Sequence, residues 1–288
     1  MSKKFNLFLL TAFTSFQLFA QQNSVLVFSK TAGFRHESIK EGRAFFENLG
    51  KTNGFKVVLS ENSDEFNEEN LKKFNAVVFL NTTGDVLNPA QQADFERYIQ
   101  SGGGYLGIHA ASDTEYNWPW YNDLMGGYFA SHPGRNVSNV QNGKMTVIDR
   151  NHPSTAHLPE TFEREDEFYD FKSLKTDKLK FLVKVDEKSY KEGKMGDFHP
   201  MSWYHEFDGG KSFYSNFGHT PATFSEPLMT KHLSEGLKWA WASKLDFSKA
   251  KTQRAPEENR FIKTTLVKNL DGPTELAVMP NGKVIFVE

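Results

Sequence analysis

Between residues 24 and 108 the chain alternates four times between short apolar runs and segments that favour helix. The apolar runs cover residues 24–29, 55–59, 76–80 and 105–108. The segments between them, at 38–50, 70–74 and 88–101, show helical spacing or helix-start signals such as Pro89 after Asn88. Strands that alternate with helices form parallel sheets with crossover connections. We therefore predict an α/β fold, a flavodoxin-like doubly wound and mostly parallel sheet with helices on both faces.

The pattern weakens after residue 111. Further strand-like runs cover residues 144–148, 180–185, 201–207 and 212–216. Glycine pairs such as Gly209-Gly210 separate some of these runs, which predicts β-hairpins added to the parallel sheet. An amphipathic helix is predicted over residues 226–243, and it closes a domain that covers residues 21–243.

The C-terminal part of the chain has a different character. Residues 244–260 are charged and weakly apolar and include Pro256, which predicts a linker. Residues 261–288 return to strand-like alternation, with a hairpin turn at Pro280-Asn281-Gly282. Because so short a segment buries too little apolar surface to fold alone, we interpret it as a fragment or as the first strands of a second domain.

The N-terminus has the layout of a secretory signal peptide. Lys3 and Lys4 precede an apolar stretch over residues 5–19, and Ala20 is a suitable cleavage residue. A membrane anchor is the alternative, but this stretch is shorter than the ~20 residues that a spanning helix needs. We predict a signal peptide over residues 1–20, an exported protein in the periplasm or outside the cell, and no membrane span after cleavage.

Composition excludes several classes of function. The chain contains no cysteine, which rules out thiolate metal sites and cysteine nucleophiles. Its 34 basic and 36 acidic residues give a net charge of -2, unlike the basic surface that holds nucleic acid. Neither a dinucleotide-binding glycine motif nor a P-loop is present.

Polar residues follow three of the predicted parallel strands. Arg35 and His36 follow the first strand, Asn81 and Thr82 the third, and His109 the fourth, with Asp113 four residues later. Ligands of doubly wound sheets bind at the carboxyl ends of the strands. The sequence therefore places His36, His109 and Asp113 as candidate catalytic residues at one rim, although a single histidine is more often structural.

The segment around His109 resembles a nucleophile elbow, a sharp turn from strand to helix that exposes its central residue. Downstream, the acidic run at 163–170 offers Asp166 or Glu167 as a carboxylate for this rim, the alternative being a solvated face. Imidazole and carboxylate groups serve as acids and bases or as ligands of a divalent metal such as zinc, but no diagnostic ligand spacing is present. Further candidates for substrate binding are Trp118, Trp120, His132, Tyr169, His199 and His219.

Several ordered motifs carry a resemblance to a known family. They are KTAGFRH at 30–36, FLNTTGD at 79–85, GIHAASDT at 107–114, WPW at 118–120, SHP at 131–133, DEFY at 166–169, MGDFHP at 195–200 and FGHT at 217–220. Together these blocks resemble the ThuA-like (trehalose utilisation) family. The resemblance implies the fold of class I glutamine amidotransferases, with His109 in place of their cysteine and hence no glutaminase activity. It also implies a link to trehalose-related disaccharides through 3-keto-sugar metabolism.

The C-terminal tail from Leu270 to Glu288 is similar to the opening of glucose/sorbosone dehydrogenase β-propellers, which use pyrroloquinoline quinone. Exported ThuA-like domains are often fused to such propellers. Since only the first strands are present, we expect no quinone site in this chain.

These observations support one leading hypothesis and two rivals. The leading one is an exported domain that acts on a keto-disaccharide as a lyase or hydrolase, with His36 and His109 as acid, base or metal ligands and Asp113 or Glu167 orienting an imidazole. The first rival is a non-catalytic sugar-binding module that delivers substrate to a fused sugar dehydrogenase. The second is a docking module of a larger exported oxidoreductase.

Overall fold

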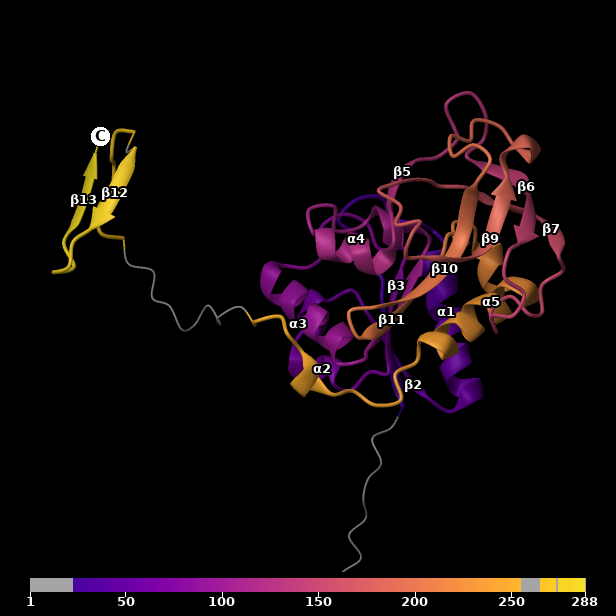
Figure 1. Ribbon diagram of the computed structural model, residues 1–288, viewed down its shortest axis with the longest axis horizontal. Helices are drawn as coiled ribbons and strands as arrows, with labels where there is room; N and C mark the ends of the chain where they lie inside the picture. Colours follow the sequence, from indigo (N-terminus) through magenta and orange to yellow (C-terminus); the bar gives the residue numbers. More distant parts are fainter. Residues whose placement is uncertain (1–22, 255–264, 273, 288) are drawn as a thin grey trace, which may run out of the picture. The chain divides into compact units, whose positions relative to one another are not determined.

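The computed structural model describes residues 23–254, 265–272 and 274–287 (Figure 1). Contacts divide the chain into two units at Arg254, and each is described by itself. The predicted signal peptide lies outside the described residues, as does most of the second half of the predicted linker.

The first unit is built on a nine-stranded sheet with the order β2-β1-β3-β4-β11-β10-β9-β6-β7. Its first five strands are parallel: β2 (Lys56–Ser60), β1 (Ser24–Phe28), β3 (Ala76–Leu80), β4 (Gly104–Ile108) and β11 (Gly210–Ser215). With β11 as the fifth strand, this is the flavodoxin-like order 2-1-3-4-5. The predicted α/β fold is therefore confirmed.

Four antiparallel strands extend this sheet and confirm the added hairpins: β10 (His199–Phe207), β9 (Lys180–Asp186), β6 (Val140–Val147) and β7 (Thr161–Glu167). A separate pair joins β5 (Tyr128–Ser131) to β8 (Asp170–Lys172). Strand β7 coincides with the acidic run, and Arg164, Asp166 and Glu167 in it are buried. The run is therefore a buried charged strand and not only a solvated face.

Helices cover both faces of the sheet (Figure 1). Their bounds are α1 (Ile39–Asn53), α2 (Glu68–Leu71), α3 (Pro89–Gln100), α4 (Pro119–Met125) and α5 (Pro227–Ala240). Short 3-10 turns are η1 (Ser63–Glu65), η2 (His109–Asp113), η3 (Glu187–Ser189), η4 (Pro221–Phe224) and η5 (Phe247–Lys249). Asn88 begins α3 with a capping box that it forms with Gln91, as the Asn-Pro signal predicts.

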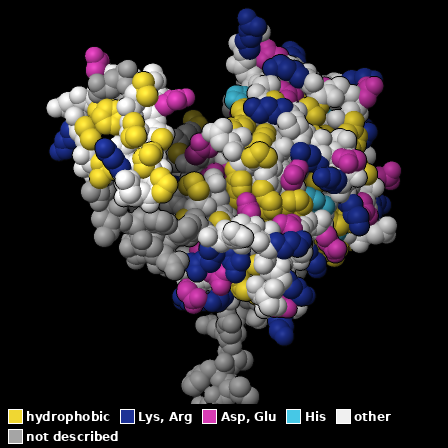
Figure 2. Space-filling view, turned by 60° about the vertical axis from the view of Figure 1, so that its left-hand side comes forward, with side chains coloured by type: hydrophobic (Ala, Val, Ile, Leu, Met, Phe, Trp, Pro, Cys, Tyr) yellow, Lys and Arg dark blue, Asp and Glu magenta, His cyan; other side chains and the backbone are white. Residues whose placement is uncertain are grey.

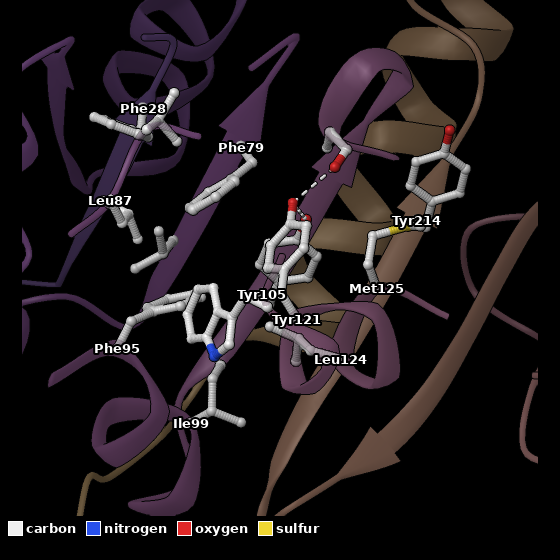
Figure 3. Close-up of a cluster of buried hydrophobic side chains, with 14 of the residues drawn as sticks. Phe28, Phe79, Leu87, Phe95, Ile99, Tyr105, Tyr121, Leu124, Met125 and Tyr214 are labelled. Carbon is white, nitrogen blue, oxygen red and sulfur yellow. Dashed lines mark hydrogen bonds between the residues drawn. The ribbon is translucent and has the colours of Figure 1, made fainter. Parts of the chain in front are cut away.

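Alternate residues of the central strands supply two hydrophobic layers, because successive side chains of a strand point to opposite faces. Val27 and Leu106 pack with α1 and α5, whereas Phe79 and Tyr105 pack with α3 and α4. The second layer is rich in aromatic rings (Figure 3). Within it the buried hydroxyls of Tyr105 and Tyr121 lie 2.8 Å apart, so neither is left without a partner.

The predicted linker begins as a segment packed along α3. The Asp246 amide donates to the Ser101 carbonyl at 2.8 Å, and the Arg254 guanidinium lies 2.8 Å from Asp94. Up to Arg254 the chain is thus held against the first unit.

The second unit contains a hairpin of antiparallel strands, β12 (Glu275–Val278) and β13 (Val284–Val287), joined at the predicted turn. Its apolar side chains are largely exposed, as Figure 2 shows. The interpretation of this tail as the start of a propeller stays a prediction. Among the described residues, no helix has both the length and the hydropathy to cross a membrane.

A buried histidine on α5 predicts that the fold loses stability in mild acid. Burial lowers the pKa of His232 to about 3, and its ring contacts the Ser154 carbonyl and the Ser202 hydroxyl. Below pH 6.5 the unfolded chain binds a proton that the folded chain rejects until about pH 3, so stability falls by up to about 1.4 kcal/mol per pH unit in this window. We expect His232→Gln to be less stable at pH 7 but to show a shallower loss between pH 6 and pH 4, measured by urea unfolding. Equal slopes in both proteins would contradict this account.

Candidate functional site

Side chains from the carboxyl ends of the parallel strands converge at one rim of the sheet. His36 follows β1, Asn81 follows β3, His109 follows β4, and Asn216 and His219 follow β11. The strand order reverses between β1 and β3, which is where doubly wound sheets bind ligands.

His109 occupies a sharp turn directly after β4. Its φ of +47° lies in the left-handed region, and the 3-10 turn η2 begins at this residue. A Cβ at Gly107 would lie 2.8 Å from the Tyr105 hydroxyl and 3.2 Å from the Ala111 Cβ, so this position before the turn leaves little room for a side chain. The elbow-like geometry is present, with histidine as its central residue. Strained backbone of this kind is often found at functional sites.

Four of the candidate residues form a cluster, which we call the histidine–Glu167 cluster: the buried His36, His109 and Glu167 and the partly exposed His219. Glu167 Oε2 lies 3.2 Å from His109 Nε2 and 2.8 Å from His219 Nδ1. The His36 ring centroid lies 4.9 Å from that of His109 and 5.2 Å from that of His219. Of the two carboxylates that the acidic run offers, Glu167 is the one that contacts histidine, whereas Asp166 pairs with Arg164 at 3.1 Å.

Hydrogen bonds to the backbone set the tautomer of His109. Its Nδ1 donates to the Asn216 carbonyl at 2.7 Å, because a carbonyl oxygen can only accept. In the neutral ring Nε2 then carries a lone pair, and this atom faces Glu167. The Asn216 amide also donates to the Glu167 carbonyl at 2.8 Å, so one residue holds both partners in place.

Glu167 remains a carboxylate inside the protein. Burial alone would raise the pKa of Glu167, but its close contacts with the His109 and His219 rings outweigh burial and hold this pKa well below its ordinary range. Its second oxygen, Oε1, accepts a hydrogen bond from Asn139 at 2.7 Å and lies 3.4 Å from His132 Nδ1. His132 is 40% exposed, so the cluster opens to solvent on this side.

The surroundings of the cluster shift the pKa values of two histidines in opposite directions. Burial, together with His109 and His219, lowers the pKa of His36 to about 2, so His36 is neutral near pH 7. Burial would also lower the pKa of His219, but contact with Glu167 raises it above its ordinary value. Neighbouring titratable groups whose pKa values are shifted in opposite directions are typical of catalytic sites.

Tyr169 and His199 lie behind the cluster. The Tyr169 ring packs on His109 with centroids 4.1 Å apart, and its hydroxyl is 3.3 Å from His36 Nε2. His199 Nε2 donates to the Tyr169 carbonyl at 2.8 Å. His199 belongs to a second group with Asp170 and Glu187, in which its Nδ1 is 2.9 Å from Glu187.

The remaining strand-end candidates have other partners. Arg35 pairs with Glu61 at 2.8 Å on the surface. Asn81 donates to the Gly218 carbonyl at 3.1 Å and supports the loop that carries His219. The hydroxyl of Thr82 lies 2.9 Å from that of Thr114. Asp113 accepts a hydrogen bond from Tyr116 at 2.6 Å, while burial raises its pKa.

Trp118 and Trp120 lie away from the cluster. Their rings stack at 5.2 Å, and Trp118 packs on Phe95 of α3 and donates to Glu96 at 2.9 Å. Trp120 donates to Asp208, which lies in the turn before β11 and therefore at the opposite end of this strand from Asn216. The structure does not bring this pair to the rim.

Sequence reasoning missed Asn139, Asn216 and Gly218. Asn216 directly follows a strand, so the strand-end rule would have found it once β11 was placed in the parallel sheet. Gly218 has a φ of +146° and leaves no room for a side chain beside Ile108 and His109, which a local pattern does not reveal. No local signal marks Asn139.

The histidine–Glu167 cluster has the donor set of a transition-metal site. One ligand atom from each residue can be chosen so that all lie within 4.8 Å of one another. Imidazole nitrogens with one carboxylate oxygen suit zinc and similar divalent ions. The group Asp170–Glu187–His199 meets the same distance limit.

Fold and site together define a flavodoxin-like α/β protein whose elbow residue is histidine and whose rim carries a histidine–carboxylate cluster. The family model described as ThuA, trehalose utilisation, matches residues 24–240. The chain belongs to this family, as its motifs predict.

Solved structures show the same fold. A protein described as ThuA-like from Bacteroides uniformis is 23% identical, with a TM-score of 0.64 over 82% of this chain and 100% of its own. Another described in this way, from Parabacteroides merdae, is 18% identical, with a TM-score of 0.62 over 83% of this chain and 94% of its own. Among curated proteins, no sequence matches the chain.

The close packing around Gly218 can be tested by substitution. A Cβ at this position would lie 2.7 Å from Ile108 Cγ2 and 3.3 Å from the Cβ of His109, at a φ that favours glycine. We expect Gly218→Ala to lower the free energy of unfolding by about 2–4 kcal/mol, as chemical denaturation would measure. The matched control is Gly196→Ala, at a φ of +72° with no atom within 4 Å, which should cost only about 1 kcal/mol. An equal loss of stability in both variants would show that close packing against Ile108 and His109 does not limit the residue at position 218.

Proposed function

We propose that this protein is an exported enzyme that acts on a keto-disaccharide related to trehalose and breaks its glycosidic bond. The observation that carries the proposal is the convergence of His36, His109, His219 and Glu167 at the rim where this fold binds ligands. The trehalose link comes from the family to which the chain belongs. A buried carboxylate among imidazoles supports proton-transfer or metal-assisted chemistry.

A 3-keto sugar makes such chemistry straightforward. The ketone acidifies the C–H bond on the neighbouring carbon, and a base can remove that proton to leave an enolate. The electron pair of the enolate then forms a carbon–carbon double bond while the adjacent glycosidic C–O bond breaks. The leaving oxygen takes up one proton from an acid, so atoms and charges balance. Addition of water to the double bond would complete a net hydrolysis.

The exposure of the cluster suggests how its members divide these tasks. His36 and His109 are 4% and 0% exposed, so they hold the arrangement from inside. The side chains of His219 and His132 are 20% and 40% exposed, so a sugar can reach them. In this proposal the partly exposed rings of His219 and His132 face the sugar, and one of them gives or takes the proton at the substrate.

One observation favours the docking rival. In the described part of the second unit, the apolar side chains of Leu276, Val278, Ile285 and Val287 are between 48% and 71% exposed. Such a face suits a partner such as the propeller of a sugar dehydrogenase. The sugar-binding rival gains less support, because Trp118 is 7% exposed and offers little surface to a sugar, whereas Trp120 is half-buried.

Turnover of 3-keto-trehalose tests the enzyme hypothesis. We expect the full-length protein to release glucose, detected by NMR or mass spectrometry, and His219→Ala and Glu167→Gln to lower the rate by about 100-fold or more. The control is His157→Ala, whose ring contacts the Leu228 carbonyl outside the cluster and should leave the rate unchanged. A sugar that binds but is recovered intact after long incubation would favour the binding module. A protein that does not bind the sugar at all would favour the docking module.

Export gives a separate test. When the chain is expressed with its own N-terminus in a Gram-negative host, we expect the protein in the periplasmic fraction, with its mature end near Gln21 by N-terminal sequencing. A cytoplasmic protein that retains the residues before Ala20 would contradict export and leave the proposed reaction unaffected.

A further inference from the structure

We propose that His36, His109, Glu167 and His219 bind one divalent transition-metal cation, of which zinc is the representative. The proposal deepens the proposed function and rests on it for the role of the cation, whereas binding itself is tested without a substrate. Three steps lead to it: the distances between donor atoms, the unmet bonding of buried nitrogens, and the residues that hold the ligands from behind.

The donor atoms already lie near the spacing of a small coordination shell. Ligand atoms about 2.0–2.1 Å from a tetrahedral zinc ion lie roughly 3.3–3.4 Å from one another. Glu167 Oε2 is 3.2 Å from His109 Nε2 and 2.8 Å from His219 Nδ1, and every pair among the four residues lies within 4.8 Å. Small side-chain rotations would therefore close the shell without moving the strands.

Hydrogen bonding within the protein leaves buried nitrogens unsatisfied. His36 Nδ1 is buried without a hydrogen-bond partner, on a residue that is only 4% exposed. Nδ1 of His219 lies near Glu167, but in a direction that makes no hydrogen bond. Because buried polar atoms are normally paired, atoms of this kind point to a missing ligand.

Protonation of one ring does not give every buried nitrogen of the cluster a partner. His109 gives its Nδ1 hydrogen to the Asn216 carbonyl, so in the neutral ring its Nε2 lone pair faces a carboxylate oxygen. A proton on Nε2 would satisfy that pair and leave the nitrogens of His36 and His219 as they are. A cation at the centre would meet the lone pairs of all the rings and the charge of Glu167 together.

The residues behind the cluster support ligation. Histidine ligands commonly donate their second ring nitrogen to a carbonyl, which fixes the tautomer that binds metal. His109 makes this contact with Asn216, and Glu167 Oε1 is held by Asn139, which leaves Oε2 for the cation. In the second candidate group, Asp170–Glu187–His199, the carboxylate is already engaged, because Glu187 accepts amide hydrogen bonds from Met195 and Gly196.

The donor set also indicates which cation fits. Nitrogen-rich sites select zinc and its neighbours, whereas calcium and magnesium prefer oxygen ligands. His219 and the adjacent His132 are partly exposed, so a sugar oxygen can approach the cation from that side. A bound cation would polarise the keto oxygen and stabilise the enolate of the proposed reaction.

Metal binding by the full chain, without a histidine tag, tests the inference. After removal of metal with a chelator, titration calorimetry with Zn²⁺ should show one ion per chain, confirmed by elemental analysis, and the melting temperature should rise. Glu167→Gln and His109→Gln should each weaken binding by about 100-fold or more. His157→Ala and Glu187→Gln are controls, both expected to keep one ion. Circular dichroism shows whether each variant is folded, and His219→Gln, the most exposed ligand, replaces any that is not.

The outcomes separate this inference from the proposed function. Zinc bound at the cluster in a protein that leaves 3-keto-trehalose intact would support the metal site and overturn the reaction. Turnover of 3-keto-trehalose by a protein that binds no Zn²⁺ in the titration would overturn the metal site and leave acid–base catalysis. Loss of the ion in Glu187→Gln with retention in Glu167→Gln would place it at the second group and refute the assignment.

Discussion

A carboxylate buried at the end of β7 is the constraint on which the rim depends. Glu167 is 2% exposed, and a buried charge is costly unless it is paired and hydrogen-bonded. Histidines from the ends of β4 and β11 and the amide of Asn139 surround it. Its neighbour Asp166 is also buried and accepts a hydrogen bond from the Gly218 amide at 3.3 Å. Two successive carboxylates thus hold the loop that carries His219.

Sheet topology explains how distant parts of the chain meet there. The parallel strands direct their carboxyl ends to one rim, while β10, β9, β6 and β7 extend the sheet to its far edge. The chain then leaves β7 and returns across the rim, where Tyr169 packs on His109. The helices and hydrophobic layers on both faces of the sheet hold the strands in place, so the packing of the core fixes the geometry of the cluster.

The sequence predicted the part of this arrangement that follows from local pattern. The alternation of strand and helix gave the parallel sheet, and the strand-end rule placed His36 and His109 together. The residue types alone named Glu167 and His219 as candidates, but a charge run and a loop histidine carry no local signal of burial, so Asp166 and a solvated face stayed open as alternatives. The tryptophans show the limit of composition: aromatic density at 118–120 suits a sugar platform or a core equally, and here the rings pack on α3. Asn139 and Gly218 act only through contacts made after folding.

The order in which the residues of the histidine–Glu167 cluster occur along the chain has a consequence for folding. His36 follows the first strand and His219 follows β11, the last strand of the sheet in the sequence, so the cluster closes only when the whole unit is assembled. Contacts between residues so far apart form late, because the long loop between them must close first. Because β11 lies between β4 and β10 in the sheet, a chain that lacked it could bring neither Asn216 nor His219 to the rim. Formation of the histidine–Glu167 cluster would therefore report complete assembly of the parallel sheet.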